Sequence, residues 1–440
     1  MKKLLIVTLA LLAAAALLAA CGKSESSSKA ETASGTDTSN PADTTAASED
    51  TSSEPEAPAE EGLKAPVADA PFDPASGITE NMLTRSVHFE GDTSRLAAKL
   101  RNICDEGYSK GSTVVFLGDS ITQGSGASGS KNQYTALIEE WFDENAKSSC
   151  VCINAGIGAT DSYLGVHRAD RDVLANDPDI VFIEFINDAD NEFYKSTMDS
   201  LIRKCLSCES QPAVVLIEMS LKGGGNCQSA HSAAAEAYNV PVLSYHDAVA
   251  PEVEAGNFSF DDISGDGTHP NDIGHGWVAD IAKSFLEKVK AGMDSAPAPE
   301  AFDPSTPSPT GDKFADATIL DSASEGLTVS ADETFAVGTT PSQFKNGWKT
   351  SEGGTITFEA EFRNLGLLYY KSTSGKYGSV SVDIDGEKKT LVNADFKGGW
   401  GSYPTNAECY SSDETKKHTV TITVRDGEKQ KFEVLGLLVS

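Results

Sequence analysis

The chain has 440 residues, with 66 acidic against 35 basic side chains and a formal net charge of −31. One ordinary domain rarely reaches this length, so two domains joined by connecting segments are expected. The excess of negative charge argues against nucleic acid and anionic membrane surfaces as partners, because both are polyanions.

The N-terminus has the pattern of a secretory signal. Basic residues follow Met1, and the apolar run 4–20 ends in small residues just before Cys21. This arrangement resembles the lipobox of bacterial lipoproteins, in which the cysteine receives lipid and becomes the new N-terminus. We therefore expect residues 1–21 to form a lipoprotein signal with Cys21 as the lipidation site. The remainder is then anchored in the cell envelope, on the outer face of the cytoplasmic membrane. An ordinary signal peptide that contains a cysteine is the alternative.

The segment 22–70 consists mainly of Ser, Thr, Ala, Glu, Asp and Pro, with few large apolar side chains. It cannot bury enough apolar surface to fold, so we expect a disordered acidic spacer. A flexible coil of about 45 residues spans roughly 35–40 Å root-mean-square. Such a spacer would hold the next domain away from a membrane surface.

Strand and helix patterns alternate from 85 to 292. Apolar runs predict strands at 113–117, 150–154, 179–186, 212–219 and 241–245, and helical periodicity predicts helices at 94–106, 131–146, 191–208, 226–238 and 272–290. The strands are continuous apolar runs, which is typical of a parallel sheet covered on both faces. We expect an α/β domain with a three-layer, doubly wound parallel sheet.

The pattern changes after a Pro-rich linker at 293–313. Within 314–440 the sequence predicts short strands at 355–362, 367–371, 379–384, 418–424 and 432–439, with a turn at Asp385-Gly386. No helical period appears, so a second, all-β sandwich domain is expected. Large aromatic residues near the predicted turns are Trp348, Tyr377, Trp400 and Tyr403. They can stack on sugar rings or fill the core, and for any single one the core is favoured.

A nucleophile is predicted where the strand 113–117 leads into Gly118-Asp119-Ser120. This places Ser120 on a strand-to-helix turn at the carboxyl end of a strand, where open α/β sheets bind ligands. The alternative is a turn serine without a catalytic role. A serine becomes nucleophilic when a base takes its proton and a further group orients that base.

Asp266 and His269, just ahead of the last predicted helix, have the spacing that such a base requires. The carboxylate can hold one imidazole nitrogen while the other faces Ser120. His231 and His275 are rival bases, but both lie inside predicted helices and are interpreted as structural.

Donors for a developing oxyanion are predicted in two segments that follow strands. The first is the glycine block 154–160, in which Gly156 and Gly158 are both candidates. The second contains Asn187, which could instead cap a strand end. All these residues are expected on one rim of the sheet.

These segments resemble, in order and spacing, the four sequence blocks of the SGNH (GDSL-type) hydrolases. The blocks are Gly118-Asp119-Ser120, the glycine block 154–160, Asn187-Asp188 and Asp266-x-x-His269, and the resemblance covers about 85–290. Many members have a glycine pair before Asn-Asp, where this chain has Phe185-Ile186.

The resemblance implies a flavodoxin-like SGNH fold and a role for each matching residue. Ser120 would be the nucleophile and first oxyanion donor, with Gly158 and the Asn187 side chain as the other donors. His269 would be the base and Asp266 its orienting group. The choice between Gly156 and Gly158 stays open.

The expected function is that of an extracytoplasmic serine esterase that forms an acyl-enzyme and needs neither a metal nor an organic cofactor. The resemblance implies small acyl groups, and acetyl on a carbohydrate, either a polysaccharide or a cell-wall glycan, is the first choice. Two alternatives are a lipid esterase of the lysophospholipase or thioesterase type and a non-catalytic glycan-binding lipoprotein. The particular glycan, any protein partner and the oligomeric state stay open.

The chain contains eight cysteines, of which those other than Cys21 are Cys104, Cys150, Cys152, Cys205, Cys208, Cys227 and Cys409. An odd number outside the cytoplasm implies a free thiol or an environment that does not enforce oxidation. The pairs Cys150-x-Cys152 and Cys205-x-x-Cys208 permit a four-thiolate zinc site. One pair is predicted on a strand and the other on a helix, so ordinary buried thiols are favoured.

Overall fold

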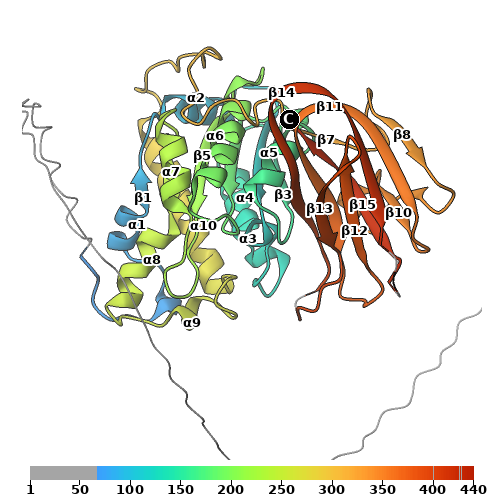
Figure 1. Cartoon of the computed structure of the whole chain (residues 1–440). Coiled ribbons are helices and arrows are strands. Elements are labelled where there is room, and N and C mark those ends of the chain that lie inside the picture. Colours follow the sequence, from blue (N-terminus) through green and yellow to red (C-terminus); the bar gives the residue numbers. More distant parts are fainter. Residues whose placement is uncertain (1–66, 400, 426, 428) are drawn as a thin grey trace, which may run out of the picture. The chain divides into compact units, whose positions relative to one another are not determined.

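The computed structural model describes residues 67–399, 401–425, 427 and 429–440 (Figure 1). The predicted signal segment, Cys21 and most of the acidic spacer lie outside the described residues. The end of that spacer is ordered, contrary to prediction, because the Asp69 N–H donates to the buried Glu252 carboxylate at 3.0 Å. The described residues belong to one compact unit.

The first part of this unit is an α/β domain on a six-stranded sheet with strand order β1-β6-β5-β4-β2-β3 (Figure 1). The strands are Val87–Phe89 (β1), Ser112–Gly118 (β2), Cys150–Gly156 (β3), Ile180–Glu184 (β4), Ala213–Glu218 (β5) and Val242–Ser244 (β6). Strands β2 to β6 are parallel, as predicted. The short β1 adds an antiparallel edge that the sequence pattern did not predict.

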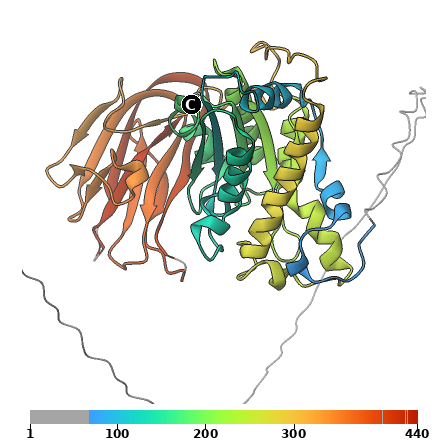
Figure 2. The ribbon, with the colours of Figure 1, turned by 180° about the vertical axis from the view of Figure 1, so that it is seen from behind.

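Helices cover both faces of this sheet, which confirms the three-layer prediction. Figure 2 shows α2, α4 and α10 over one face, and α5, α6 and α7 lie over the other (Figure 1). The helices are Glu80–Arg85 (α1), Ser94–Ile103 (α2), Ser120–Gln123 (α3), Tyr134–Asn145 (α4), Ser162–Asp172 (α5), Glu192–Ser207 (α6), Gln228–Glu236 (α7), Tyr245–Glu254 (α8), Phe260–Ile263 (α9) and Asp272–Gly292 (α10). In the described part of the chain, no helix combines the length and apolar character needed to cross a membrane.

The second part is an all-β domain whose named strands pair antiparallel. They follow the order β13-β12-β14-β11-β15-β10-β9, with β7 beside β15 and β8 beside β11. The strands are Thr318–Leu320 (β7), Thr328–Ala331 (β8), Ala336–Val337 (β9), Trp348–Thr350 (β10), Thr355–Lys371 (β11), Ser379–Ile384 (β12), Glu387–Asn393 (β13), Tyr403–Val424 (β14) and Phe432–Val439 (β15). The predicted short strands 355–362 and 367–371 are one continuous strand, so the break predicted between them is wrong. Register shifts near Asn364 and Gly366 bend β11 there instead.

The Pro-rich segment 293–313 lies along α6 rather than free in solution. Arg203 donates to the Pro304 and Thr306 carbonyls, and the Ser308 hydroxyl donates to the buried Asp199 at 2.6 Å. These contacts satisfy backbone carbonyls that would otherwise need water.

The two domains share one apolar core. Tyr163 and Val166 of α5 are buried in the same cluster as Phe314, Leu368 and Leu435 of the β domain. Beside this core, the Asn406 amide donates to the Asp161 carboxylate, which also caps α5. The β domain is thus fixed next to the segment that contains the glycine block.

Candidate active site

The predicted nucleophile sits where β2 turns into α3. Strand β2 ends at Gly118, and Asp119 then caps α3 by accepting the Ile121 N–H at 2.9 Å. Its second oxygen accepts the Asn187 N–H at 3.1 Å. Because Asp119 is fully buried, its pKa is raised well above the usual carboxyl value. This one side chain therefore joins the turn that holds Ser120 to the loop that holds Asn187.

The structure brings Ser120, His269 and Asp266 together. The imidazole Nε2 of His269 lies 2.9 Å from the Ser120 Oγ, and its Nδ1 lies 2.7 Å from the Asp266 Oδ2. This is the arrangement in which a serine hydroxyl can lose its proton to a ring nitrogen while a carboxylate holds the tautomer. Ser120 is only 9% exposed, so its oxygen reaches solvent mainly through the cavity in front of it.

Asp266 is kept ionised by the loop around it. Burial acts to raise its pKa, but hydrogen bonds from the His269 ring and from the His269 and Thr268 N–H groups lower this pKa to about 2. The same N–H bonds hold the loop in one conformation, so the carboxylate and the ring face each other.

The glycine block separates into a packing position and a donor position. The Gly156 N–H donates to the Asn154 Oδ1 at 2.9 Å, and a methyl group on Gly156 would lie 2.3 Å from the Gln123 backbone nitrogen. Gly158 instead lines the cavity together with Ser120, and its N–H donates to the Gln123 side chain, which lines the same cavity. The structure thus favours Gly158 over Gly156 as an oxyanion donor, and places Asn187 on the same cavity wall.

We expect the two glycines to respond differently to alanine. Gly156→Ala forces backbone apart and should lower the free energy of unfolding by about 1–3 kcal/mol. Gly158→Ala meets only the end of the Gln123 side chain at 2.8 Å, so stability should change by roughly 0.5 kcal/mol or less. Its esterase kcat should still fall, because the methyl group fills the oxyanion space. Denaturant unfolding and ester hydrolysis measure both, and equal destabilisation would contradict the assignment.

Arg168 on α5 is a supporting residue that the sequence patterns did not reveal. Its buried guanidinium donates to the carbonyls of Gly118 at 2.9 Å and Ala155 at 2.7 Å, and pairs with Asp172. These carbonyls end β2 and β3, so Arg168 fixes the two strand ends that lead to the nucleophile turn and the glycine block. A lone arginine on a helix gives no spacing signal that sequence reasoning could use.

The site residues open into a cavity of about 810 Å³. Its walls come from both domains: Ser120, Gln123, Ser125, Ile157, Gly158, Ala159, Asn187, Asp266, Thr268, His269, Thr340, Pro341, Gln343, Tyr370, Ser402, Tyr403 and Pro404. Of the aromatic residues considered above, Tyr403 lies here, whereas Trp348 and Tyr377 are buried in the β-domain core. Trp400 lies outside the described residues.

Comparisons with known proteins agree with this geometry. Residues 116–277 match the model of the GDSL-like lipase/acylhydrolase family. The crystal structure of a two-domain esterase (CEX) active on acetylated mannans is 30% identical, with a TM-score of 0.73, and the match covers 81% of this chain and 98% of that one. The chain belongs to the GDSL-like lipase/acylhydrolase family.

A second structure of that esterase, co-crystallized with mannopentaose, matches this GDSL hydrolase with 29% identity and a TM-score of 0.72, over 81% of this chain and 97% of that one. A search of curated proteins gives no match. Both structural matches extend across the α/β and the β domain. The protein is accordingly a carboxylic ester hydrolase of the SGNH type with an additional β domain.

The rival histidines of this GDSL hydrolase have structural partners. His275 stacks on Tyr134, and its Nε2 lies 3.0 Å from the Ser125 carbonyl oxygen. His231 is buried, with Asp188 3.0 Å from one ring nitrogen and Glu218 3.0 Å from the other. Burial acts to lower the pKa of His231, but the neighbouring Glu218 carboxylate raises it well above the usual value.

Among the described residues, the group whose donor atoms could meet at a metal ion is Glu218, Cys227 and His231. A protonated His231 donates one ring N–H to Glu218 and the other to Asp188, and these hydrogen bonds account for the cluster without a metal ion. The four cysteines of the alternative zinc site do not form such a group in the described part of the chain, and all are free thiols.

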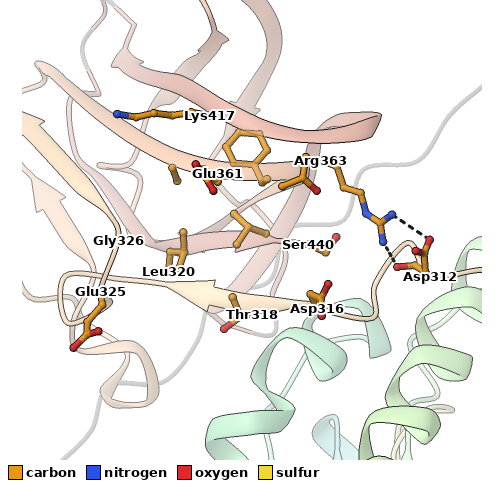
Figure 3. A pocket seen from close by; sticks show the side chains of 14 residues that line it. Asp312, Asp316, Thr318, Leu320, Glu325, Gly326, Glu361, Arg363, Lys417 and Ser440 are labelled. Atoms are coloured by element: carbon orange, nitrogen blue, oxygen red, sulfur yellow. Dashed lines mark hydrogen bonds and ion pairs between the residues drawn. The ribbon is translucent and has the colours of Figure 1, made fainter. Parts of the chain in front are cut away.

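A further cavity of about 650 Å³ lies on the β domain of the hydrolase (Figure 3). Charged side chains surround it, and Arg363 pairs with Asp312 at its edge. Its lining residues include no histidine or cysteine. It lacks the Ser–His–Asp arrangement, and the ester chemistry is assigned to the cavity of Ser120.

Proposed function

We propose that this hydrolase removes acetyl groups from a carbohydrate, with an acetylated mannan-type polysaccharide as the first candidate. The observation that carries the proposal is the cavity that Ser120 and His269 line together with Tyr370 and Tyr403 of the β domain. Aromatic and polar side chains in the same cavity as the nucleophile suit a sugar ring, since tyrosine offers both an apolar face and a hydroxyl. The two-domain esterase active on acetylated mannans supports the same substrate class.

In the first half of the reaction, the Ser120 Oγ attacks the acetyl carbonyl carbon while the His269 Nε2 takes the hydroxyl proton. The negative charge that develops on the carbonyl oxygen is held by the N–H groups of Ser120 and Gly158 and by the Asn187 amide. When the tetrahedral intermediate collapses, the sugar oxygen leaves and receives the proton from His269.

In the second half, a water molecule replaces the sugar. His269 takes a proton from the water as the water oxygen attacks the acetyl-Ser120 carbonyl. The same donors hold the second oxyanion, and its collapse releases acetate and returns the proton to Ser120. Asp266 stabilises the imidazolium that forms in each half.

The cavity lining favours a short acyl group. The lining combines apolar residues (Ile157, Ala159, Pro341 and Pro404) with polar side chains such as Gln123, Ser125 and Thr340, so no unbroken aliphatic surface lines it in the described part of the chain. A long acyl chain needs a continuous apolar groove to bury its methylene groups. This observation disfavours the lysophospholipase alternative.

The decisive experiment compares acetate release from acetylated glucomannan, acetylated xylan and acetylated peptidoglycan by the wild type and by Ser120→Ala. We expect release from at least one of these glycans, glucomannan first, and none above background from the variant. A clear preference for long over short p-nitrophenyl esters would contradict the acetyl assignment. Folded wild type that a fluorophosphonate does not label would favour the non-catalytic alternative.

We also propose that Cys21 carries lipid and holds the enzyme outside the cytoplasmic membrane. The support is the sequence around Cys21 and the acidic spacer after it, which is long enough to let the domains reach a polymer. In a bacterial host, the wild type is expected in the membrane fraction and Cys21→Ala in the soluble fraction. Retention of Cys21→Ala in membranes, after removal of the signal, would contradict lipid anchoring.

A further inference from the structure

The Gly158 N–H already has an acceptor in the unliganded protein. The Gln123 Oε1 accepts this N–H at 3.1 Å. A methyl group placed on Gly158 would lie 2.8 Å from that oxygen and 3.7 Å from the Ser120 Cβ. The Gln123 carbonyl oxygen therefore stands beside the nucleophile, where an acyl oxygen would receive the same N–H.

The side chain of Gln123 is free to leave this position. It is exposed, and within the described residues it makes no hydrogen bond other than the one from Gly158. Asn154, which accepts the Gly156 N–H, differs because its amide also donates to the Thr122 carbonyl at 2.7 Å and to Thr135 at 3.0 Å. The acceptor of the Gly156 N–H is thus held in place, whereas the acceptor of the Gly158 N–H is a side chain that can rotate into solvent.

Asn187 keeps a donor available throughout. Its amide donates to the Thr160 carbonyl at 3.1 Å, and an amide nitrogen carries a second N–H. Gly158 has a single N–H, so an ester oxygen gains this donor only after Gln123 gives it up.

We propose that Gln123 is a displaceable cap on the oxyanion site, whose side-chain carbonyl fills the acceptor position until an acyl oxygen takes its place. This inference rests on the proposed function, since it concerns how the ester enters the same site. Gln123 acts through the Gly158 N–H and is a positioning residue. The cap competes with every ligand that brings an oxygen to Gly158, including the acetate product.

The cap should affect binding more than turnover. Gln123 must leave before either the ester carbonyl or the oxyanion can bind, so its displacement weakens ground-state and transition-state binding equally. Such a uniform effect appears in KM while kcat stays unchanged. Removing the cap is therefore expected to lower KM.

The test compares the full-length protein with its variants Gln123→Ala, Gln123→Met and Gln123→Glu. For each, KM and kcat are measured with p-nitrophenyl acetate, and Ki is measured with ethylboronic acid. The boron accepts a bond from the Ser120 oxygen as His269 takes the hydroxyl proton, and the resulting anionic tetrahedral boronate places one of its oxygens near the Gly158 N–H. With alanine or methionine, KM and Ki should fall about three- to tenfold, which is the change in an equilibrium constant expected from the loss of one neutral hydrogen bond. Because both removals leave chemistry intact, kcat should stay within about twofold.

Gln123→Glu should shift both constants in the opposite direction. A carboxylate accepts the Gly158 N–H more strongly than an amide does, and it repels the charged oxygen of the boronate. Opposite signs for glutamate and for alanine or methionine distinguish a cap from general loosening of the site, which would weaken binding in all three variants.

Unchanged or higher KM and Ki in both Gln123→Ala and Gln123→Met would overturn the cap. If the wild type is active through Ser120 and only this pattern is missing, the cap alone fails. If the wild type shows no hydrolysis that depends on Ser120, the proposed function fails and the cap fails with it.

Discussion

Replacing Ser120 with alanine is expected to lower kcat for ester hydrolysis by roughly 10⁴-fold or more, because among the described residues its hydroxyl is the one hydrogen-bonded to the His269 Nε2. Its Oγ is 2.9 Å from the His269 Nε2, and this contact supplies the reactive oxygen. Stability should change little, since the variant only removes one oxygen that points into a cavity. Steady-state kinetics with p-nitrophenyl acetate and a thermal melt measure the two effects.

The matched control is His269→Ala, alone and combined with Ser120→Ala. Since the two side chains act as one unit, the double variant should be no slower than the slower single variant, within about threefold. If the kcat losses of the two single variants multiplied in the double variant, Ser120 and His269 would act in separate steps. A single Ser120→Ala variant that keeps a tenth of the wild-type kcat would remove Ser120 from the chemistry.

Asp266→Asn carries the second largest expected effect, a loss of roughly 10²- to 10⁴-fold in kcat. An asparagine amide can donate to the His269 Nδ1, which would leave the proton on the nitrogen that must accept from Ser120. The carboxylate side chain is 57% exposed, so water can partly replace it, and the loss should be smaller than for Ser120→Ala. A variant with wild-type kcat would show that the loop around His269 orients the ring without Asp266.

The pH dependence gives an independent check on Asp266. Its pKa of about 2 lies below the unperturbed value, so folding favours the ionised form. The stabilisation is present above the unperturbed pKa and is lost as the pH falls towards 2. Asp266 therefore stays charged wherever the enzyme can be assayed, and its own protonation should not cause a loss of activity at mildly acidic pH. If the fall in activity at acid pH persists in Asp266→Asn, it does not come from protonation of this carboxylate; if it disappears, the carboxylate is its cause.

The sequence was most informative where a local pattern and a chemical requirement coincide. The strands around Ser120 are continuous apolar runs, and each predicted site segment follows a strand or precedes the last helix. The fold class and the convergence of Ser120, His269 and Asp266 could therefore be predicted. The choice between Gly156 and Gly158 could not, because it depends on the Gln123 backbone, which would lie 2.3 Å from a methyl group added to Gly156.

Other elements were missed for physical reasons. Helix α5 (Ser162–Asp172) is buried from Ser162 to Ala169 between the sheet and the β domain, and this buried stretch contains polar side chains such as His167 and Arg168, which obscure it as a core helix in the sequence. Strand β1 has only three residues, too few to establish a period. In β11 the polar pair Arg363-Asn364 resembled a turn, but Asn364 is buried and bonded to the Lys313 carbonyl, so the strand continues through it.

The shared core around α5 has a consequence for how this enzyme can be divided. A chain that stops after α10 would leave Tyr163 and Val166 facing water, without Phe314, Leu368 and Leu435 against them. Such a fragment would carry every reacting group and still be prone to aggregate. The α/β domain therefore depends on the β domain. Exchange of the β domain between related enzymes would require redesign of the apolar contact surface between the two domains.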